Sequence, residues 1–433
     1  MTAGRTVAVI GGGWAGLAAA VESSRGGADV TLFEMAPQLG GRARDVSVDG
    51  MALDNGQHIA IGAYSETLAL LRDLGIAEDH AFLRMPLRLM DADGEGLILR
   101  GGPSSLAFVR GVLTHSRWSW ADKLSLLRAA AGWLAGGFRC SELLTVADLS
   151  RTIRDRVQRE LIEPLCVAAL NTDASAASAR VFLRVVRDAL FSGSGASDLL
   201  LPRLGLGKIL PTPAAHWLVR AGVTIHLRHR VQELMAAGPG WTVDGARFDA
   251  VVLASTASEN ARLVNAVSPT WAAMAGALPF APIATVYLRS VGTSLPWPML
   301  VLHADERQPA QFVFDRGQLG GVEGLLAFVI SGAEKWVDLG SEAMLDATRR
   351  QAEATLGAFL KSPLEAVKVV IEKRATFRCT PALRRPAPAI ANRLWAAGDY
   401  LEGPYPSTLE GAVRSGIAAG CAANRSLHGP ASK

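Results

Sequence analysis

The predicted fold of this chain is decided by the segment Val7-Ala8-Val9-Ile10-Gly11-Gly12-Gly13-Trp14-Ala15-Gly16-Leu17-Ala18-Ala19-Ala20. Its first four residues are apolar and indicate a buried strand, and its last residues indicate the start of a helix. Between them, Gly11, Gly13 and Gly16 have the G-x-G-x-x-G spacing. One glycine permits a tight turn, one lets the backbone approach a pyrophosphate, and one lets helix and strand pack closely. The segment therefore predicts a nucleotide-binding turn.

The start of the predicted helix faces the same turn. The helix is expected to open at Leu17 to Glu22, and its N-terminus presents unpaired N–H groups and a partial positive charge, a combination that binds phosphate. A second apolar run, Val30-Thr31-Leu32-Phe33, indicates the return strand, and Glu34 ends it, 18 residues after Gly16. An acid at about this distance, roughly 20 residues, binds ribose hydroxyls in such units. It fits the free 2′-hydroxyl of FAD or NAD and repels a 2′-phosphate. The alternative is a doubly wound sheet whose glycines serve packing alone.

The composition limits the class of protein. The chain has 433 residues, of which 49% are hydrophobic and 19% are charged, so it can build a large core and is not disordered. This length corresponds to about two or three folding units. The formal net charge of +4 is small and the basic residues form no long run, so nucleic acid is not an expected partner.

The spacing of the cysteines and the length of the apolar runs indicate the cellular compartment in which the protein is expected. None of the four cysteines is spaced as a CxxC pair: Cys140, Cys166, Cys379 and Cys421. We therefore expect neither a metal site nor a disulfide framework, and reduced thiols fit a cytoplasmic protein. The Gly-rich first strand and turn do not resemble a secretory signal. No stretch of about 20 uninterrupted apolar residues is present, so no transmembrane span is expected.

The order of strand and helix signals predicts an α/β protein with two interleaved domains. Strands and helices alternate through about the first ninety residues, and mainly helical periodicity follows from Leu97 to about Leu204. We expect a Rossmann-like nucleotide-binding domain at 1–90, 205–260 and 387–433. We expect an α+β substrate-binding domain at 91–204 and 261–386. Such interleaving places a pocket at the interface between the domains.

Several local patterns predict element limits. Leu200 to Gly207 predict a turn-rich break, and a helix is expected from about Leu210 to Ala221. Strands are expected at Val223 to Leu227 and at Val231 to Leu234. Near the C-terminus, Glu410 to Asn424 predict a helix rich in alanine and glycine.

Three further motifs place glycines and polar residues beside the expected ligand. Gly40-Gly41-Arg42 follows the ribose acid, and its arginine can pair with phosphate or with flavin oxygens. Asp54-Asn55-Gly56-Gln57-His58 is a polar turn within apolar sequence. Gly398-Asp399 follows a predicted strand, and Ser407 to Gly416 begin a helix whose amides can face a ring carbonyl.

In their order along the chain, these motifs resemble those of the flavin-dependent amine oxidase and phytoene desaturase superfamily. The resemblance implies that the nucleotide-binding domain holds FAD. The FAD-binding residues that it implies are Gly11, Gly13, Trp14, Ala15 and Gly16 at the pyrophosphate, Glu34 at the adenosine ribose, Val231 at the adenine, Gly41, Arg42, Asn55 and Gly56 along the flavin, Gly398 and Asp399 at the ribityl chain and phosphate, and Leu409 facing the flavin ring.

Three segments are also similar to the bacterial hydroxysqualene dehydroxylases, the squalene-associated FAD enzymes of hopanoid biosynthesis: Leu53 to Ile59, Glu163 to Thr172 and Tyr405 to Ala412. This resemblance implies reductive removal of the allylic hydroxyl of hydroxysqualene to give squalene. It implies a long-chain isoprenoid substrate and association with other squalene and hopanoid enzymes. The alternatives are a carotenoid or phytoene-type desaturase, an amine oxidase, or a FAD-binding scaffold without turnover.

Two residues of these segments are candidate catalysts. His58 can donate a proton to the leaving hydroxyl, or it can hold the turn beside the flavin. Tyr405 can donate to the same oxygen, or it can form one wall of an apolar pocket. Cys379 lies upstream of the last motif, as does the flavin-linking cysteine of some amine oxidases. Its local sequence does not match that site, so FAD is expected to be non-covalent.

One segment indicates a membrane contact. Residues 109–139 mix tryptophans with basic side chains, which suits a helix lying in the headgroup region at the inner face of the cell membrane. The alternative is an ordinary surface helix with tryptophans in the core. A membrane-facing entrance would suit a substrate that is almost insoluble in water.

Overall fold

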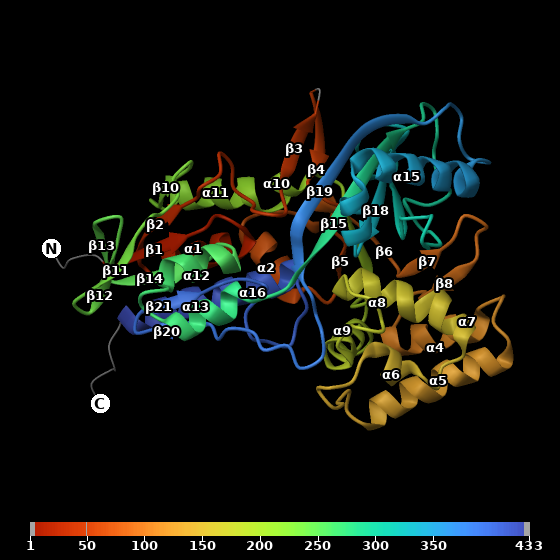
Figure 1. The fold of residues 1–433 in the computed structure, drawn as a ribbon, viewed down its shortest axis with the longest axis horizontal. Helices are drawn as coiled ribbons and strands as arrows, with labels where there is room; N and C mark the ends of the chain where they lie inside the picture. The colour runs from red at the N-terminus through yellow and green to blue at the C-terminus, as the bar shows by residue number, and fades with distance from the viewer. Residues whose placement is uncertain (1–4, 49, 428–433) are drawn as a thin grey trace.

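The structure, a computed structural model, describes residues 5–48 and 50–427 and has two lobes (Figure 1). One lobe is built on a six-stranded sheet with the strand order β10-β2-β1-β14-β21-β20. Its strands are β1 (Thr6–Ile10), β2 (Asp29–Phe33), β10 (Thr224–His226), β14 (Ala250–Leu253), β20 (Ala389–Ala391) and β21 (Leu394–Ala396). Neighbouring strands are parallel except β20 and β21.

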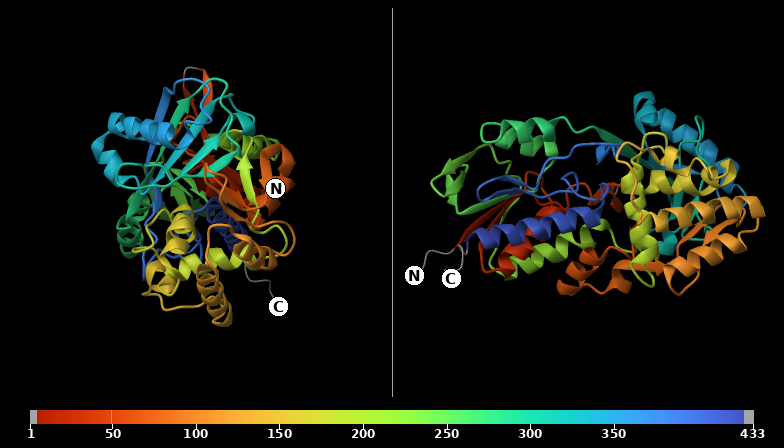
Figure 2. Two further views of the ribbon diagram at one scale, coloured as in Figure 1. Left: turned by 90° about the vertical axis from the view of Figure 1, so that its right-hand side faces the viewer. Right: turned by 90° about the horizontal axis from the view of Figure 1, so that it is seen from below.

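Strand β1 lies inside this sheet because both of its faces are apolar. Val7 and Val9 point to a core formed with the helices α1 (Trp14–Arg25), α11 (Pro211–Arg220) and α16 (Leu409–Leu427). Ala8 and Ile10 point to the opposite core, which includes residues of α12 (Ala257–Val264) and α13 (Pro269–Gly276). The small antiparallel sheet of β11 (Leu234–Ala237), β12 (Gly240–Val243) and β13 (Ala246–Phe248) contributes to the same core. Figure 2 shows helices on both sides of the sheet, as parallel strands require.

The other lobe contains a five-stranded antiparallel sheet with the order β16-β17-β18-β15-β19. Its strands are β15 (Phe280–Arg289), β16 (Met299–Val301), β17 (Phe312–Asp315), β18 (Leu325–Ser331) and β19 (Glu365–Phe377). Helices α14 (Glu334–Leu339) and α15 (Ser341–Leu356) pack on this sheet, and their apolar residues join those of β15 and β18 in one core. The long strands β15 and β19 run back toward the first lobe (Figure 1).

A group of helices completes the second lobe (Figure 1). It comprises α4 (Ser104–Thr114), α5 (Trp120–Ala135), α6 (Val146–Ser150), α7 (Asp155–Val157), the π-helical turn η1 (Gln158–Ile162), α8 (Glu163–Leu170) and α9 (Ala179–Phe191). Shorter elements make up the rest of the described secondary structure: β3 (Asp45–Val48), β4 (Met51–Asp54), β5 (Ala60–Ile61), β6 (Phe82–Met85), β7 (Arg88–Met90), β8 (Gly96–Ile98), β9 (Leu199–Pro202), α2 (Ser65–Asp73), α3 (Glu78–Ala81), α10 (Leu206–Ile209) and η2 (Gly317–Leu319).

The predicted α/β fold with a parallel nucleotide-binding sheet is confirmed, but two local predictions are wrong. The turn-rich break begins with a strand, since β9 pairs with β5 and β6 and is buried along its whole length. Only these long-range pairings reveal it. The strand expected from Val231 begins instead at Leu234. The N–H groups of Gln232 and Glu233 donate to the Asp244 carboxylate rather than to a neighbouring strand.

The limits of the two domains stay a proposal. The proposed limit between residues 260 and 261 falls within helix α12.

In residues 5–48 and 50–427, no helix has both the length and the apolar character needed to cross a bilayer.

Candidate active site

A single continuous cavity of about 1190 Å³ joins the glycine turn of the first lobe to the helices of the second. Nearly all of the site residues predicted from sequence line it. These are Gly11, Gly13, Trp14, Ala15, Glu34, Gly41, Arg42, Asn55, Gly56, His58, Val231, Gly398, Asp399, Tyr405 and Leu409. Gly16 is the exception, because it faces the strand behind the turn. The fold thus brings together motifs that are up to about 400 residues apart in the sequence.

The glycine turn is held by close backbone contacts. A Cβ atom on Gly16 would lie 1.8 Å from the carbonyl oxygen of Gly11, so only glycine lets α1 pack this tightly on β1. Gly11 has φ +111°, and a Cβ atom there would lie 2.6 Å from the Ala254 backbone. These contacts leave the first turn of α1, with Gly13, Trp14 and Ala15, facing the cavity. A helix N-terminus exposed in this way provides donors for phosphate oxygens.

Glu34 lies beside the turn with its carboxylate fixed by two backbone groups. The Gly12 N–H donates to one carboxylate oxygen at 2.7 Å, and the Ala36 N–H donates to the other at 2.7 Å. The side chain is buried but lines the cavity. Each oxygen has a further lone pair, so the carboxylate can also accept from ribose hydroxyls.

Val231 lines the cavity near Glu34, and its carbonyl oxygen accepts a hydrogen bond from the Arg262 guanidinium. A backbone contact from Val231 to a bound base can use its N–H group or the second lone pair of its carbonyl oxygen.

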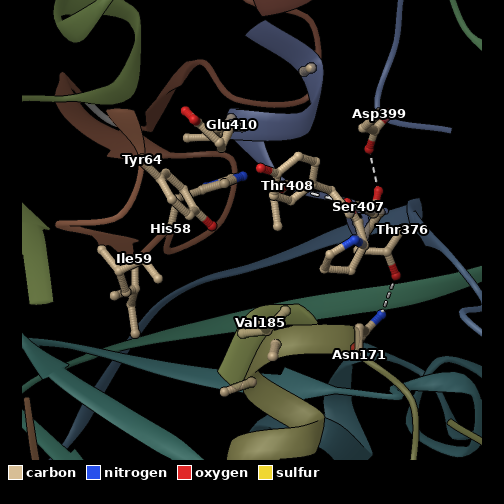
Figure 3. A pocket seen from close by; sticks show the side chains of 18 of the residues that line it. His58, Ile59, Tyr64, Asn171, Val185, Thr376, Asp399, Ser407, Thr408 and Glu410 are labelled. Carbon is tan, nitrogen blue, oxygen red and sulfur yellow. Dashed lines mark hydrogen bonds between the residues drawn. The ribbon is translucent and has the colours of Figure 1, made fainter. Parts of the chain in front are cut away.

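Arg42 and Asp399 pair across the middle of the cavity. The Arg42 Nη2 atom lies 2.5 Å from Asp399 Oδ1, and its Nη1 atom donates to the Ala375 carbonyl at 2.6 Å. The Ser407 hydroxyl donates to the second oxygen of Asp399 (Figure 3). Burial lowers the pKa of Arg42, but Asp399, Glu372 and Tyr400 together oppose burial and the net pKa is raised. Arg42 is therefore a permanent cation that can face a phosphate or a flavin oxygen.

The polar turn after β4 carries His58. Asn55 anchors this turn through its Nδ2 atom, which donates to the Arg42 carbonyl at 3.1 Å. The Nδ1 atom of His58 lies 3.1 Å from the Gly56 carbonyl, which makes Nδ1 the protonated nitrogen of the neutral ring. Burial lowers the pKa of His58. The neutral ring presents Nε2 as an acceptor, which suits it to hold the turn rather than to protonate a leaving group.

A buried polar network fixes the same turn from behind, and sequence reasoning missed most of it. Gln57 donates through Nε2 to the Tyr287 hydroxyl at 3.0 Å, and that hydroxyl donates to the Asp54 carbonyl at 2.9 Å. Arg316 donates to Gln57 Oε1 at 3.2 Å and lies 3.6 Å from the Asp54 carboxylate. Burial raises the pKa of Asp54 to about 6, although Arg316 opposes the shift. The network ties β4, which leads into the polar turn of His58, to β15 and η2 of the second lobe.

Tyr405 lies between two guanidinium groups. The Arg184 Nη2 atom of α9 donates to the Tyr405 hydroxyl oxygen at 2.6 Å, and Arg184 also stacks at 4.6 Å from the ring centre. Arg414 of α16 lies 5.4 Å from the ring centre. Because Arg184 donates to its oxygen, the phenol hydrogen is free to be donated elsewhere. Burial raises the pKa of Tyr405, and the two cations partly oppose the shift.

Beyond His58 and Tyr405 the cavity becomes an apolar chamber. Its walls include Leu97, Leu99, Phe108, Leu127, Trp133 and Phe182. One polar pair stands at its inner end: the Asn171 Nδ2 atom donates to the Thr376 hydroxyl at 2.9 Å (Figure 3). Asn171 also accepts from the Gly332 N–H at 2.8 Å, so it fastens the end of α8 to the antiparallel sheet.

These features fit a dinucleotide whose flavin would lie where the polar part of the cavity meets the apolar chamber. The cavity is lined by a helix N-terminus, a carboxylate that can accept from ribose hydroxyls, and a cation. Cys379 does not line the cavity, and burial raises the pKa of its thiol to about 12. In residues 5–48 and 50–427, no cluster of three metal-ligating side chains is present.

The residues that sequence reasoning missed share one property. Arg184, Arg316 and Tyr287 meet their partners across more than two hundred residues of chain. Nothing in their own local sequence signals those contacts. Asn171 and Gln57 lie within the segments that resemble a known family, but their partners cannot be read from those segments.

Comparison with known proteins agrees with this geometry. The sequence model of the family described as flavin containing amine oxidoreductase matches residues 14–424. The chain is 30% identical to the hydroxysqualene dehydroxylase of Rhodopseudomonas palustris, over 95% of this chain and 96% of that protein. It is 27% identical to the hydroxysqualene dehydroxylase of Sinorhizobium fredii over the same shares. Among solved structures, an oxidoreductase from Methanosarcina mazei has a TM-score of 0.71 at 16% identity, covering 96% of this chain and 99% of that one.

Proposed function

The chain belongs to the flavin-containing amine oxidoreductase family, and from this premise we propose that it removes the allylic hydroxyl of hydroxysqualene reductively to give squalene for hopanoid synthesis. Family membership makes it an FAD-dependent oxidoreductase. The specific reaction is a proposal, supported by similarity to hydroxysqualene dehydroxylases along the whole chain. A carotenoid-type desaturase and an amine oxidase are the alternatives within the family.

The observation that carries the proposal is the continuity of the cavity. Its cofactor end is polar and its chamber is lined by hydrocarbon side chains, so a long isoprenoid chain can lie in the chamber with one carbon beside the cofactor. An amine would place a charged or polar group in that chamber, where few groups can pair with it. Such alignment of the reacting carbon can lower the barrier by several kcal/mol.

The residues that hold the cofactor follow from the site. The glycine turn and the start of α1 would hold the pyrophosphate, Glu34 would accept from the ribose, and Arg42 with Asp399 would lie along the flavin. Bound in its reduced form, FAD would supply a hydride to the reacting carbon, and the protein would supply the proton with which the hydroxyl leaves as water. The apolar chamber keeps bulk water away from the reacting carbon.

We assign the proton to Tyr405 and a positioning role to His58. The phenol hydrogen of Tyr405 is free because Arg184 donates to its oxygen. Arg184 and Arg414 also stabilise the phenolate that donation leaves behind. His58 is held neutral by burial and bonds to the turn that carries it.

We propose that FAD is bound without a covalent link, since Cys379 lies outside the cavity and its thiol is buried. Denaturation should release all of the flavin into the supernatant. Flavin that stays with the precipitated protein would contradict this.

We further propose that the protein works in the cytoplasm at the inner face of the cell membrane, with other squalene and hopanoid enzymes nearby. Its substrate and product are almost insoluble in water, so both have to be taken from and returned to an apolar phase.

An anaerobic single-turnover experiment tests the reaction. The purified enzyme is reduced with dithionite, freed of excess reductant and mixed with hydroxysqualene, and the flavin absorbance is followed while products are extracted. We expect flavin reoxidation with an equal amount of squalene formed. Reoxidation without squalene, or no reoxidation, would reject the proposal.

A parallel experiment tests the alternatives: the oxidised enzyme is offered phytoene and simple amines. Turnover of phytoene would favour a desaturase, turnover of an amine an amine oxidase, and no reaction with any of the compounds a FAD-binding scaffold.

A further inference from the structure

Exposed apolar side chains gather on one part of the second lobe. Half of the exposed large hydrophobic side chains among the described residues lie there: Leu106, Val109 and Leu113 of α4, Trp120, Leu124 and Leu134 of α5, and Phe191 at the end of α9. Trp120 is 73% exposed, although tryptophan is normally well covered. We call the outward sides of α4 and α5, together with Phe191, the docking face. Helix α5 forms the lower edge of this lobe in Figure 1.

The outward side of α5 is unlike that of a helix exposed to water. The exposed residues that repeat along it are Trp120, Leu124, Arg128, Ala131 and Ala135. A helix at the surface of a soluble protein normally turns polar residues outward. Here the outward side is apolar apart from one arginine, so the helix has an apolar surface that nothing in the described chain covers.

Basic residues outnumber acidic residues in the segment that forms this face. Residues Ser104 to Arg139 contain five basic side chains and one acidic residue, Asp122, which is buried and caps α5. Arg110 and Arg128 are exposed and have no ion-pair partner in the part of the chain that the structure describes. Arg117 differs, because it pairs with two acidic residues of the β7–β8 turn.

The cavity opens through the same face. Four large apolar side chains of the docking face are both exposed and part of the cavity lining: Leu106, Val109, Leu134 and Phe191. They form an apolar mouth on the docking face. A hydrocarbon that enters through this mouth passes from one apolar environment to another, provided that the face itself is not in water.

We propose that the docking face lies in the headgroup region of an anionic lipid bilayer, with the cavity mouth open to the acyl chains. In this arrangement, Trp120 and Leu124 enter the boundary between headgroups and acyl chains, and Arg110 and Arg128 contact lipid phosphates. The proposed isoprenoid substrate explains why such a membrane contact would be useful, so this inference rests on the proposed function. The evidence for the contact itself is the exposure of the apolar side chains and the charge of the face. The charge favours an anionic lipid surface over a second copy of this chain, because two copies would place arginines opposite arginines.

Vesicle flotation with the oxidised holoenzyme tests the proposal without any turnover. Vesicles of phosphatidylcholine alone are compared with vesicles that also contain phosphatidylglycerol, each at low and moderate salt. We expect flotation with the anionic vesicles and weaker flotation as salt rises. Absence of flotation under every condition would overturn the docking face and would leave the proposed reaction untouched.

Variants locate the contact on the molecule. Removing two basic side chains with Arg110→Gln and Arg128→Gln should weaken partitioning into anionic vesicles by about thirtyfold. Trp120→Ser with Leu124→Ser should weaken partitioning into both kinds of vesicle. The matched control is Val291→Ser with Leu339→Ser, since these two side chains are each 55% exposed but lie in the other part of the lobe. Equal flotation of control and docking-face variants would overturn the proposal.

Two further measurements separate the alternatives. A dimer that forms without lipid and is lost in Trp120→Ser, measured by light scattering, would show that a second copy covers the face and would overturn the lipid proposal. The docking-face variants should keep the single-turnover rate of the wild type when hydroxysqualene is supplied in detergent micelles. A rate lowered equally in micelles would show that these residues act on the site itself, against the proposal.

Discussion

The two ends of the cavity are built by different means. At the cofactor end, backbone meets backbone: Gly16 contacts the Gly11 carbonyl, and Gly416 of α16 lies so close to α1 that a Cβ atom would be 2.1 Å from the Ala15 carbonyl. At the chamber end, side chains from α4, α5 and α9 enclose the space. At Gly16 and Gly416 the cofactor end therefore admits no added atom, whereas the chamber admits changes of shape. Recognition of the cofactor depends on a rigid backbone, and recognition of the substrate depends on side chains.

The largest effect is expected from Gly16→Val at the cofactor end. A valine would place Cβ 1.8 Å from the Gly11 carbonyl oxygen and force α1 away from β1. We expect loss of nearly all bound FAD and a destabilisation of more than about 4 kcal/mol. The measurements are flavin per protein after purification and the midpoint of urea unfolding.

The matched control at the chamber end is Gly132→Ala on α5. Nothing lies within 4 Å of the Cβ atom that it adds, so FAD content should be unchanged and helix propensity should add about 0.5–1 kcal/mol. Normal FAD binding by Gly16→Val would show that the cofactor end tolerates an added side chain as well as the chamber end does.

The next effect concerns Asp54, in the network that joins the two ends. Burial raises its pKa from 3.8 to about 6 in the folded protein. The folded state therefore binds this proton more tightly than the unfolded state. Its contribution to stability is complete below about pH 4 and is lost as the pH rises through 6, a total of about 3 kcal/mol.

Asp54→Asn removes this titration and keeps the shape of the side chain. The unfolding free energy of the wild type minus that of the variant should rise by about 1–1.5 kcal/mol when the pH falls from 7 to 5. Urea unfolding at each pH measures the difference, and titrations common to both proteins cancel. A difference that does not change with pH would show that Asp54 is ionised throughout and that Arg316 outweighs burial.

A third effect, at the junction with the chamber, is expected for Tyr405→Phe. Phenylalanine keeps the ring between Arg184 and Arg414 but removes the proton. Reoxidation of the reduced flavin by hydroxysqualene should slow roughly a hundredfold, with unchanged flavin content. Stopped-flow absorbance under anaerobic conditions measures the rate.

Two variants sharpen this result. Arg184→Gln should slow the same step roughly tenfold, and the loss of a stabilising cation should move the alkaline limb of its pH profile to higher pH. His58→Gln should act mainly through flavin binding. If His58→Gln slows the step as much as Tyr405→Phe does while keeping its flavin, the proton assignment is wrong.

The two ends also differ in how far the sequence predicts them. The turn from Gly11 to Glu34 is predictable because its chemistry lies within one strand–helix–strand unit, where spacing alone sets the geometry. Arg184 reaches Tyr405, and Arg316 reaches Gln57, only after the lobes have packed together. A periodicity predicts which side of a helix is buried but not which residue it meets. The same limit explains β9, a four-residue strand defined by partners more than a hundred residues away.

The smallest effect is expected at Asn171, where the chamber is fastened to the sheet. Asn171 ends α8 with φ +47°, a conformation that asparagine tolerates and alanine does not. Its side chain donates to Thr376 and accepts from the Gly332 N–H. Asn171→Ala should cost about 2 kcal/mol, from backbone strain and from the unpaired Gly332 amide together.

Asn171→Gly separates these two causes, because glycine adopts the same backbone conformation without strain but offers no hydrogen bonds. It should recover about 1 kcal/mol relative to Asn171→Ala, measured by urea unfolding. Thr376→Val, which removes only the hydroxyl partner, should cost less than either. In all three variants FAD content should stay near that of the wild type, because the cofactor end does not depend on this contact. If FAD content falls as the free energy of unfolding falls, the two ends of the cavity unfold as one unit. They then differ in how they are built but not in stability.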